Sequence, residues 1–344
     1  MPHIALLLPV NSSIFHRHAE ALRDGFLAAS KTPDIPTLLV RVYPVGEDAK
    51  QAVVSYKQAV STGARLVIGP LIRNAATAVA NGDISVPTLL LNTPEGTFPD
   101  RPKLYVISLQ IETEAQQAAQ QAYRDGRRNA YTVVSESPLL RRSNRAFIEE
   151  FVKLGGKHVG EFFFNTSPAE LTRLHLEVVS RKADMAFLSL DVAQARAVRP
   201  TLEQLSLYAS SQSYIGDAQT GAVIDLAGIR VFDMPWLLRR DHPAVMIYPR
   251  QSVVGDPDLD RLYALGIDAW RIGQIMLKPH TDITLDGVTG KLTLGRDRQF
   301  MRELVSVRLG TDLPDAPVGP SAPAVVAAPD KPPATVRPST MAKP

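Results

Sequence analysis

The chain has 344 residues, of which 45% are hydrophobic, and this is enough for one large core or two adjoining cores. Its 38 basic and 35 acidic residues are mixed along the sequence and leave a formal net charge of +3, so we expect no basic patch and no nucleic-acid partner. The absence of cysteine excludes disulfides, thiolate metal sites, a cysteine nucleophile and a lipid attached through cysteine.

Apolar runs alternate with amphipathic helical segments in the first part of the chain, which is typical of a parallel sheet covered by helices. The predicted strands are residues 4–10, 37–43, 65–69, 87–92 and 104–109, and the predicted helices are residues 17–30, 48–62, 74–81 and 113–125. In the first helix Ala19, Leu22 and Phe26 recur at helical spacing, so this face is expected to pack on the sheet. The run at residues 4–10 is too short to cross a membrane and has no basic leader, so we expect any signal or anchor to precede it.

The same alternation repeats after residue 129. Strands are predicted at residues 130–135, 158–164, 185–190, 207–210 and 229–232, with helices between them. The helix that carries Phe147 and Phe151 is expected to end at Gly155 in a left-handed cap. A long helix is predicted at residues 259–277, and a turn-rich hairpin that leads into residues 291–294 is expected to end the folded part.

Two similar halves predict an α/β protein with two lobes and a cleft, each lobe a parallel sheet flanked by helices. We assign residues 1–110 and about 236–282 to the N-terminal lobe, and residues 111–235 and about 283–312 to the C-terminal lobe. Residues 313–344 hold nine of the 27 prolines and no aromatic residue, so we interpret them as a disordered Pro/Ala-rich tail.

Ligands of such folds bind beyond the carboxyl ends of the strands, so the loops that follow strands supply the candidate site residues. In the first half these are Asn11, Ser12, Ser13, Arg73, Asn74, Asn92 and Thr93. In the second half they are Ser135, Glu136, Tyr208, Ser211, Gln212 and Tyr214, which could face the first set across the cleft. Helix capping and turn formation are the structural alternatives for the serine and asparagine residues, and both interpretations stay open here.

No motif indicates catalysis, a metal or a cofactor. His16 and His18 are two residues apart and have no third ligand nearby, so we interpret them as surface histidines. Asp256, Asp258 and Asp260 lack the glycine and glutamate of a calcium loop, so we interpret them as helix-capping residues. There is no phosphate-binding glycine loop and no nucleophile elbow. Trp236, next to Pro235, suits a rigid crossover between the lobes.

Several strings carry a resemblance to known proteins. IALLLP at residues 4–9 and VIGPL at residues 67–71 are similar to the opening of type I periplasmic binding proteins. YASSQ at residues 208–212, DMPWLL at residues 233–238 and RLYALGIDA at residues 261–269 narrow the match, and together the strings resemble the LpoA/LppC family from about residue 4 to residue 308.

The resemblance implies a non-enzymatic regulator of peptidoglycan synthesis that activates a class A penicillin-binding protein by direct contact in the periplasm. Members of the family are outer-membrane lipoproteins, but this chain lacks both the lipidated cysteine and the preceding helical-repeat domain, so an upstream anchor is an expectation only. The alternative is a periplasmic solute-binding receptor of an ABC transporter, with a peptidoglycan fragment or another small ligand in the cleft. The bulky, basic residues that follow the Gly69-Pro70 turn disfavour a free amino acid as that ligand.

Overall fold

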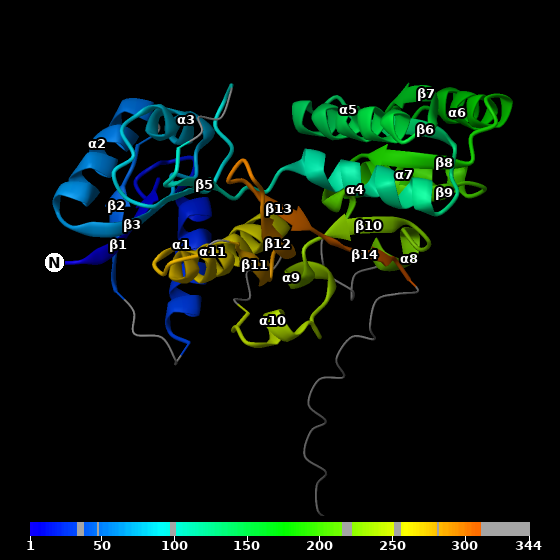
Figure 1. The fold of residues 1–344 in the computed structure, drawn as a ribbon. Coiled ribbons are helices and arrows are strands. Elements are labelled where there is room, and N and C mark those ends of the chain that lie inside the picture. Colours follow the sequence, from blue (N-terminus) through cyan, green and yellow to red (C-terminus); the bar gives the residue numbers. More distant parts are fainter. Residues whose placement is uncertain are drawn as a thin grey trace, which may run out of the picture. The chain divides into compact units, whose positions relative to one another are not determined.

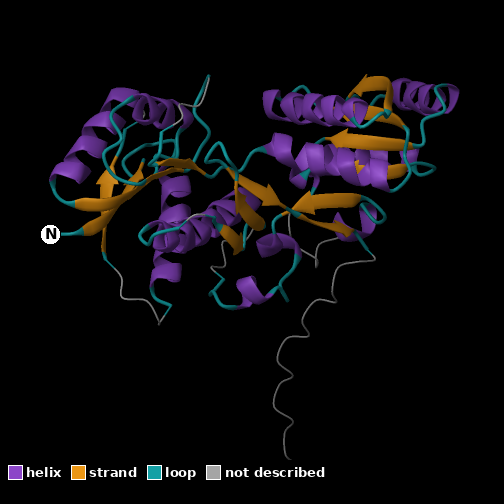
Figure 2. Cartoon of the chain, viewed as in Figure 1, coloured by secondary structure: helices purple, strands orange, loops and turns teal. Residues whose placement is uncertain are grey.

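A computed structural model describes residues 1–32, 38–46, 48–96, 101–214, 222–250, 256–280 and 282–310 of the chain. Figures 1 and 2 show that these residues form α/β layers in which helices cover β-sheets. The predicted tail at residues 313–344 and the first residue of the predicted strand at 37–43 lie outside the described residues. No described helix combines the length and the apolar character that crossing a bilayer requires.

The first sheet contains five parallel strands in the order β2-β1-β3-β4-β5. They are β1 (His3–Leu8), β2 (Leu39–Pro44), β3 (Ala64–Ile68), β4 (Thr88–Leu90) and β5 (Leu104–Val106). Successive side chains of β1 point to opposite faces, as the two-residue period of a strand requires. Leu6 packs on one face against α1 (His16–Ser30) and α11 (Pro257–Met276), and Leu7 packs on the other against α2 (Ala49–Ser61) and α3 (Arg73–Asn81).

Helices α1 and α11 touch backbone to backbone, which is why two glycines face each other there. A Cβ atom on Gly25 would lie 1.9 Å from the carbonyl oxygen of Tyr263, and one on Gly266 would lie 2.1 Å from that of Leu22. Any side chain at either position would therefore push the helices apart. This close packing ties the late helix α11 to the first sheet, although the two are far apart in the sequence.

The second sheet has six strands in the order β14-β10-β9-β8-β6-β7. They are β6 (Asn129–Val134), β7 (Lys157–Phe163), β8 (Met185–Ser189), β9 (Ser206–Ala209), β10 (Arg230–Asp233) and β14 (Val305–Arg308). Only β14 is antiparallel to its neighbour. One face is covered by α4 (Ile111–Arg124) and α5 (Pro138–Lys153), and the other by α6 (Pro168–Ser180), α7 (Val192–Val198) and the 3₁₀ turn η1 (Arg199–Leu202).

The third sheet corrects the expectation that a hairpin ends the folded part. Strands β11 (Thr284–Asp286) and β12 (Lys291–Leu294) form that hairpin, but β13 (Phe300–Glu303) then pairs with β12 and β14 pairs with β10. Polar residues interrupt residues 300–308, so the sequence offers no apolar run of the kind that identified the other strands. Three helices of four residues each, α8 (Ala222–Asp225), α9 (Pro235–Leu238) and α10 (Pro243–Met246), were missed because they are too short for a helical period.

The remaining predicted strands and helices are confirmed, with ends that differ by a few residues. Gly155 has φ +97 after α5, as the predicted cap requires. Asp256 accepts a hydrogen bond from the backbone N–H of Leu259 at the start of α11, which confirms its capping role. The division into two lobes at the stated residues stays a prediction.

Candidate functional site

A pocket of about 350 Å³ lies where β3, β4 and β5 end. The loops that follow these strands line it together with residues of α4, α5 and α11. Its polar lining consists of Arg73, Asn92, Ser108, Gln110, Glu112 and Arg142, and leucines supply the rest. Two of the predicted site residues, Arg73 and Asn92, therefore meet in one place, as parallel strands with a common carboxyl edge require.

The turn before α3 places Arg73 at this pocket. Gly69 has φ +101, and a Cβ atom there would lie 2.3 Å from the carbonyl oxygen of Leu7, so the position requires glycine. Pro70 follows with a cis peptide bond, and α3 begins at Arg73. The half-buried Arg73 thus lies at the first turn of a helix, while the next residue, Asn74, is exposed and accepts a hydrogen bond from the backbone N–H of Ala75.

Asn92 and Thr93 hold the loops around the pocket together. The Asn92 side-chain amide donates to the carbonyl oxygen of Leu71 over 3.0 Å, and its oxygen accepts from the backbone N–H of Thr93 over 2.9 Å. The Thr93 hydroxyl lies 3.0 Å from that of Ser108 and accepts a hydrogen bond from the Gln110 side chain. These contacts support the structural interpretation of Asn92 and Thr93 as turn-forming residues. A ligand role for the two residues stays a prediction.

An ion pair between α4 and α5 adds charge to the pocket. Arg142 Nε lies 2.9 Å from Glu112 Oε1, and Glu112 Oε2 is buried with no hydrogen-bond partner among the described residues. Arg73 makes the lining net positive, which suits a small ligand that carries a carboxylate. Sequence reasoning missed Glu112 and Arg142, which reach the pocket from the helices α4 and α5.

The first predicted loop lies at a different pocket. Asn11, Ser12 and Ser13 line a hollow of about 440 Å³ beside Gln51 and the end of β2, and it shares no lining residue with the first pocket. The Ser12 hydroxyl accepts hydrogen bonds from the backbone N–H groups of Ile14 and Phe15, over 3.2 and 3.0 Å. Ser12 therefore stabilises the turn that leads into α1.

The predicted residues of the second half do not line the 350 Å³ pocket. Tyr208 lies within β9, and its hydroxyl, buried beneath α4, donates to Asp125 over 2.6 Å. Tyr214 packs in the core on the opposite face of the sheet. The Ser135 hydroxyl accepts from the Gln194 side chain over 3.1 Å, and Glu136 is exposed. Tyr208 was grouped with the residues that follow the predicted strand at 207–210 although it lies within that strand, and its side chain points to the helix-covered face.

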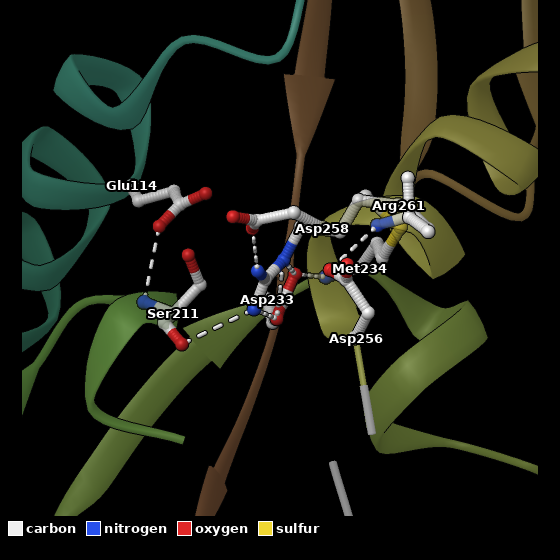
Figure 3. Close-up of polar contacts among 8 residues, drawn as sticks. Glu114, Ser211, Asp233, Met234, Asp256, Asp258 and Arg261 are labelled. Carbon is white, nitrogen blue, oxygen red and sulfur yellow. Dashed lines mark hydrogen bonds and ion pairs between the residues drawn. The ribbon is translucent and has the colours of Figure 1, made fainter. Parts of the chain in front are cut away.

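Ser211 belongs to a buried charged cluster that joins α4, β10, α11 and the 3₁₀ turn η2 (Ser211–Ser213) (Figure 3). Its backbone N–H donates to Glu114 Oε2 over 3.1 Å, and its carbonyl oxygen accepts from Arg261 Nη2, also over 3.1 Å. Arg261 Nη2 lies 2.8 Å from Asp233 Oδ2, and Arg261 Nη1 lies 2.6 Å from Asp258 Oδ1. We call Glu114, Ser211, Asp233 and Arg261 the buried cluster, and Gln212 lies beside it, half-buried.

Burial controls the charges of the cluster. Burial, followed by repulsion from Asp233, raises the pKa of Glu114 to about 7, although Arg261, the Ser211 hydrogen bond and Arg302 oppose the shift. Burial lowers the pKa of Arg261, but Asp233 and the other acids raise it by more, so Arg261 stays charged. Arg302 lies nearby on β13, where burial lowers its pKa, and it donates to the carbonyl oxygens of Ser108 and Thr289.

Sequence reasoning described only part of this cluster. Trp236 is buried after β10, and its role in a crossover between the lobes stays a prediction. The neighbouring Asp233 was given no role. A charged residue on the buried face of a long amphipathic helix, such as Arg261 on α11, is the signal that could have revealed a buried ion pair. Among the described residues, no three His, Asp or Glu side chains are placed to hold a metal ion.

The comparisons with known proteins decide the family. A family model described as "LppC putative lipoprotein" matches residues 1–309. The chain belongs to the LppC family. The penicillin-binding protein activator LpoA of Edwardsiella piscicida is 26% identical over 322 residues, which cover 81% of this chain and 46% of that protein. LpoA of Pantoea ananatis is 27% identical over 312 residues, with coverages of 77% and 46%, so the chain spans about half the length of these LppC relatives.

Solved structures confirm the fold expected of an LppC protein. The C-domain of LpoA from Haemophilus influenzae, described as a regulator of PBP1A, matches with a TM-score of 0.72 and 22% identity, covering 90% of this chain and 98% of that domain. A Chromobacterium violaceum protein described as a "putative branched-chain amino acid ABC transporter" matches with a TM-score of 0.77 and 36% identity over 90% of this chain and all of that one. The α/β fold with helix-flanked parallel sheets is therefore shared with LpoA and with periplasmic binding protein-like transporter proteins.

Proposed function

We propose that this chain regulates peptidoglycan synthesis by activating a class A penicillin-binding protein through direct contact in the periplasm. The observation that carries the proposal is the LppC match across residues 1–309, together with curated relatives named penicillin-binding protein activators. The chain also covers 98% of the LpoA C-domain that is described as a regulator of PBP1A. Regulation by contact needs a shaped surface and no reacting groups, so it requires neither a metal nor a cofactor.

The proposal includes a location and an internal organisation. The family description as a lipoprotein supports a periplasmic protein associated with the outer membrane. In the proposed two-lobed arrangement, residues 1–110 and about 236–282 form one lobe, and residues 111–235 and about 283–312 form the other. The buried cluster then joins residues of both lobes, since Arg261 falls in the first and Glu114 and Asp233 in the second. A small ligand at Arg73 and Asn92 could bias the lobes toward one arrangement.

A reconstituted synthesis reaction tests this function. The purified chain, with and without the tail at residues 313–344, is first used to capture the periplasmic domains of class A penicillin-binding proteins from the same organism. The captured enzyme is then assayed for glycan polymerisation and peptide cross-linking with and without the chain. We expect specific capture and a faster reaction, and a rate that the chain leaves unchanged for every class A enzyme would reject the proposal.

A second candidate function is a solute receptor of an ABC transporter. It is favoured by the 36% identical Chromobacterium violaceum protein and by the positively charged 350 Å³ pocket. Calorimetric titration of amino acids, peptides and muropeptides into the wild type, Arg73→Ala and Arg142→Met tests it, with Lys50→Ala on the exposed side of α2 as the control. Tight binding that both pocket variants lose and the control keeps would favour the receptor function.

A further inference from the structure

The parallel strands of the second sheet begin at the right-hand end of this sheet in Figure 1. Basic residues gather at these strand starts. They come from the end of α4, the residues before β6 and β8, the first residue of β7 and the last residue of the antiparallel β14. We call six exposed residues the basic edge: Arg124, Arg128, Lys157, Arg181, Lys182 and Arg308. Strand pairing places them along one end, since Lys157 pairs with Asn129, next to Arg128, and Arg308 pairs with Arg230.

Acidic residues at this end, Asp184, Asp125 and Glu203, offset part of that charge. The Asp184 carboxylate accepts hydrogen bonds from the backbone N–H groups of Arg128 and Asn129, over 2.9 and 3.1 Å. Asp125 accepts from the Tyr208 hydroxyl over 2.6 Å and lies 3.8 Å from Arg230, which is a further cation beside the edge. Glu203, before β9, is an exposed acid at the same end. The six cations and Arg230 outnumber these three acids, so the edge keeps an excess of positive charge.

This excess corrects the expectation that the chain has no basic patch. The whole chain carries a net charge of only +3, whereas six exposed cations lie at one end of one sheet. They belong to four separate stretches of sequence. Because basic and acidic residues are mixed along the chain, the sequence did not show that these cations lie together in space. Helices α4, α5 and α6 end here, and cations near helix C-termini stabilise helices. That explains Arg124 and Arg181, but Lys157 and Arg308 lie on strands.

Exposed aliphatic side chains accompany the cations. Val152 in the last turn of α5, Val179 in the last turn of α6 and Ile224 in α8 are 50%, 57% and 78% exposed. Each of these helices leads into a strand that begins at the basic edge. Cores of protein interfaces favour aromatic residues, methionine and arginine and are depleted in lysine and other charged residues. Lysine and arginine mixed with aliphatic residues instead suit the boundary between headgroups and acyl chains of an anionic bilayer.

We propose that the basic edge binds the anionic headgroups of a phospholipid bilayer, with Val152, Val179 and Ile224 at the boundary of the acyl chains. The attraction between cations and anionic lipids changes affinity by about fivefold per basic residue near the surface. It is screened by salt, because the Debye length falls to about 3 Å at 1 M. The interaction is separate from activation of a synthase and does not depend on it.

Vesicle co-sedimentation of the full chain tests the proposal. Vesicles of phosphatidylglycerol and phosphatidylcholine in a 3:7 ratio are compared with vesicles of phosphatidylcholine alone. We expect binding to the anionic vesicles only, with loss of binding at high salt. The variant Arg124→Glu/Lys157→Glu/Arg181→Glu should lose about a hundredfold in affinity. The matched control Lys50→Glu/Lys57→Glu/Arg65→Glu reverses three exposed cations on α2 and β3 and should bind at least tenfold more tightly than the edge variant.

A second variant separates insertion from charge attraction. Val179→Ser/Ile224→Ser keeps every charge and should weaken binding to anionic vesicles by a few fold while it preserves the salt dependence. Circular dichroism verifies that each variant is folded. Equal affinities of the edge and control variants, or no binding of the wild type to anionic vesicles, would overturn the proposal. Capture of an acidic protein by the edge without vesicle binding would likewise reject a lipid partner.

Discussion

The pocket beside the first sheet and the buried cluster beside the second are both polar, yet they are built in opposite ways. The pocket collects residues that follow neighbouring strands, and Arg73 and Arg142 in its lining are partly exposed to solvent. In the cluster, Ser211 lies 97 positions from Glu114 in the sequence, and Arg261 lies 28 positions from Asp233. The charged groups of the cluster are almost fully buried. Burial and hydrogen-bond partners therefore distinguish polar groups that are available to a ligand from polar groups that hold the fold together.

Substitutions in the buried cluster should lower the free energy of unfolding more than substitutions in the pocket. Arg261→Met is expected to have the largest effect. Removing the guanidinium leaves Asp233 buried without its charged partner, which costs about 3–5 kcal/mol of unfolding free energy. Urea titration followed by fluorescence of the two tryptophans measures the change. The control Arg239→Met breaks an exposed pair with Asp241 and should cost about 0–1 kcal/mol. Similar losses of unfolding free energy in the two variants would contradict the distinction between buried and exposed ion pairs.

The second largest effect is the pH dependence of stability that the buried carboxyl group of Glu114 produces. The folded pKa of Glu114 is about 7 against an ordinary 4.5, so the folded state holds this proton more tightly than the unfolded state. The contribution of Glu114 to stability is therefore largest below about pH 4.5 and is lost as the pH rises through about 7. The free energy of unfolding that Glu114 contributes at low pH, and that is lost at high pH, is on the order of 3 kcal/mol.

Glu114→Gln tests this prediction because glutamine still accepts from the Ser211 N–H and carries no charge. The difference in unfolding free energy between wild type and variant should change with pH in the window between about 4.5 and 7, and the variant should be the more stable protein above pH 7. Urea midpoints at pH 5 and pH 8 measure it. The exposed Glu136→Gln serves as the control. A difference that does not vary with pH would show that Glu114 titrates normally.

Arg142→Met probes charge in the pocket, where a smaller effect is expected. The pair with Glu112 is partly exposed, so its loss should cost about 0–1 kcal/mol. The same variant should change ligand affinity if the pocket binds a carboxylate. A loss above about 3 kcal/mol would place Arg142 with the buried cluster instead.

Arg73→Ala is expected to have the smallest effect on stability. The side chain is half-buried at the start of a helix, and substitutions of this kind usually stay within about 0.5 kcal/mol. Thermal unfolding of the variant should match the wild type within about 2 °C. A marked drop in the unfolding temperature would indicate that Arg73 holds the turn at Gly69 and is unavailable to a ligand.

Much of the fold was predictable because strand and helix periods are local. Leu6 and Leu7 alternate across β1, and Ala19, Leu22 and Phe26 mark the buried face of α1. The signals failed where the segment was short or polar, as in α9, α10 and residues 300–308. Arg302 is an example, because its burial depends on contacts with Ser108 and Thr289 that no local pattern contains.

The candidate site was predictable only in part for the same reason. The rule that loops after strands line ligand sites brought Arg73 and Asn92 to one pocket, since the strands of one parallel sheet share a carboxyl edge. It could not exclude Tyr208, whose side chain turns into the core. It also could not find Glu112 and Arg142, which reach the pocket from helices.

Local sequence was enough to establish the α/β class, the order of most elements, the absence of cysteine chemistry and the resemblance to the LppC family. Composition, periodicity and short strings are properties of neighbouring residues, so they need no tertiary contact. The tertiary structure alone decided which charges are buried together in the Glu114 and Arg261 cluster and which gather on the surface at the basic edge. Both depend on segments that are distant along the chain, and burial and charge density arise only when the fold brings such segments together.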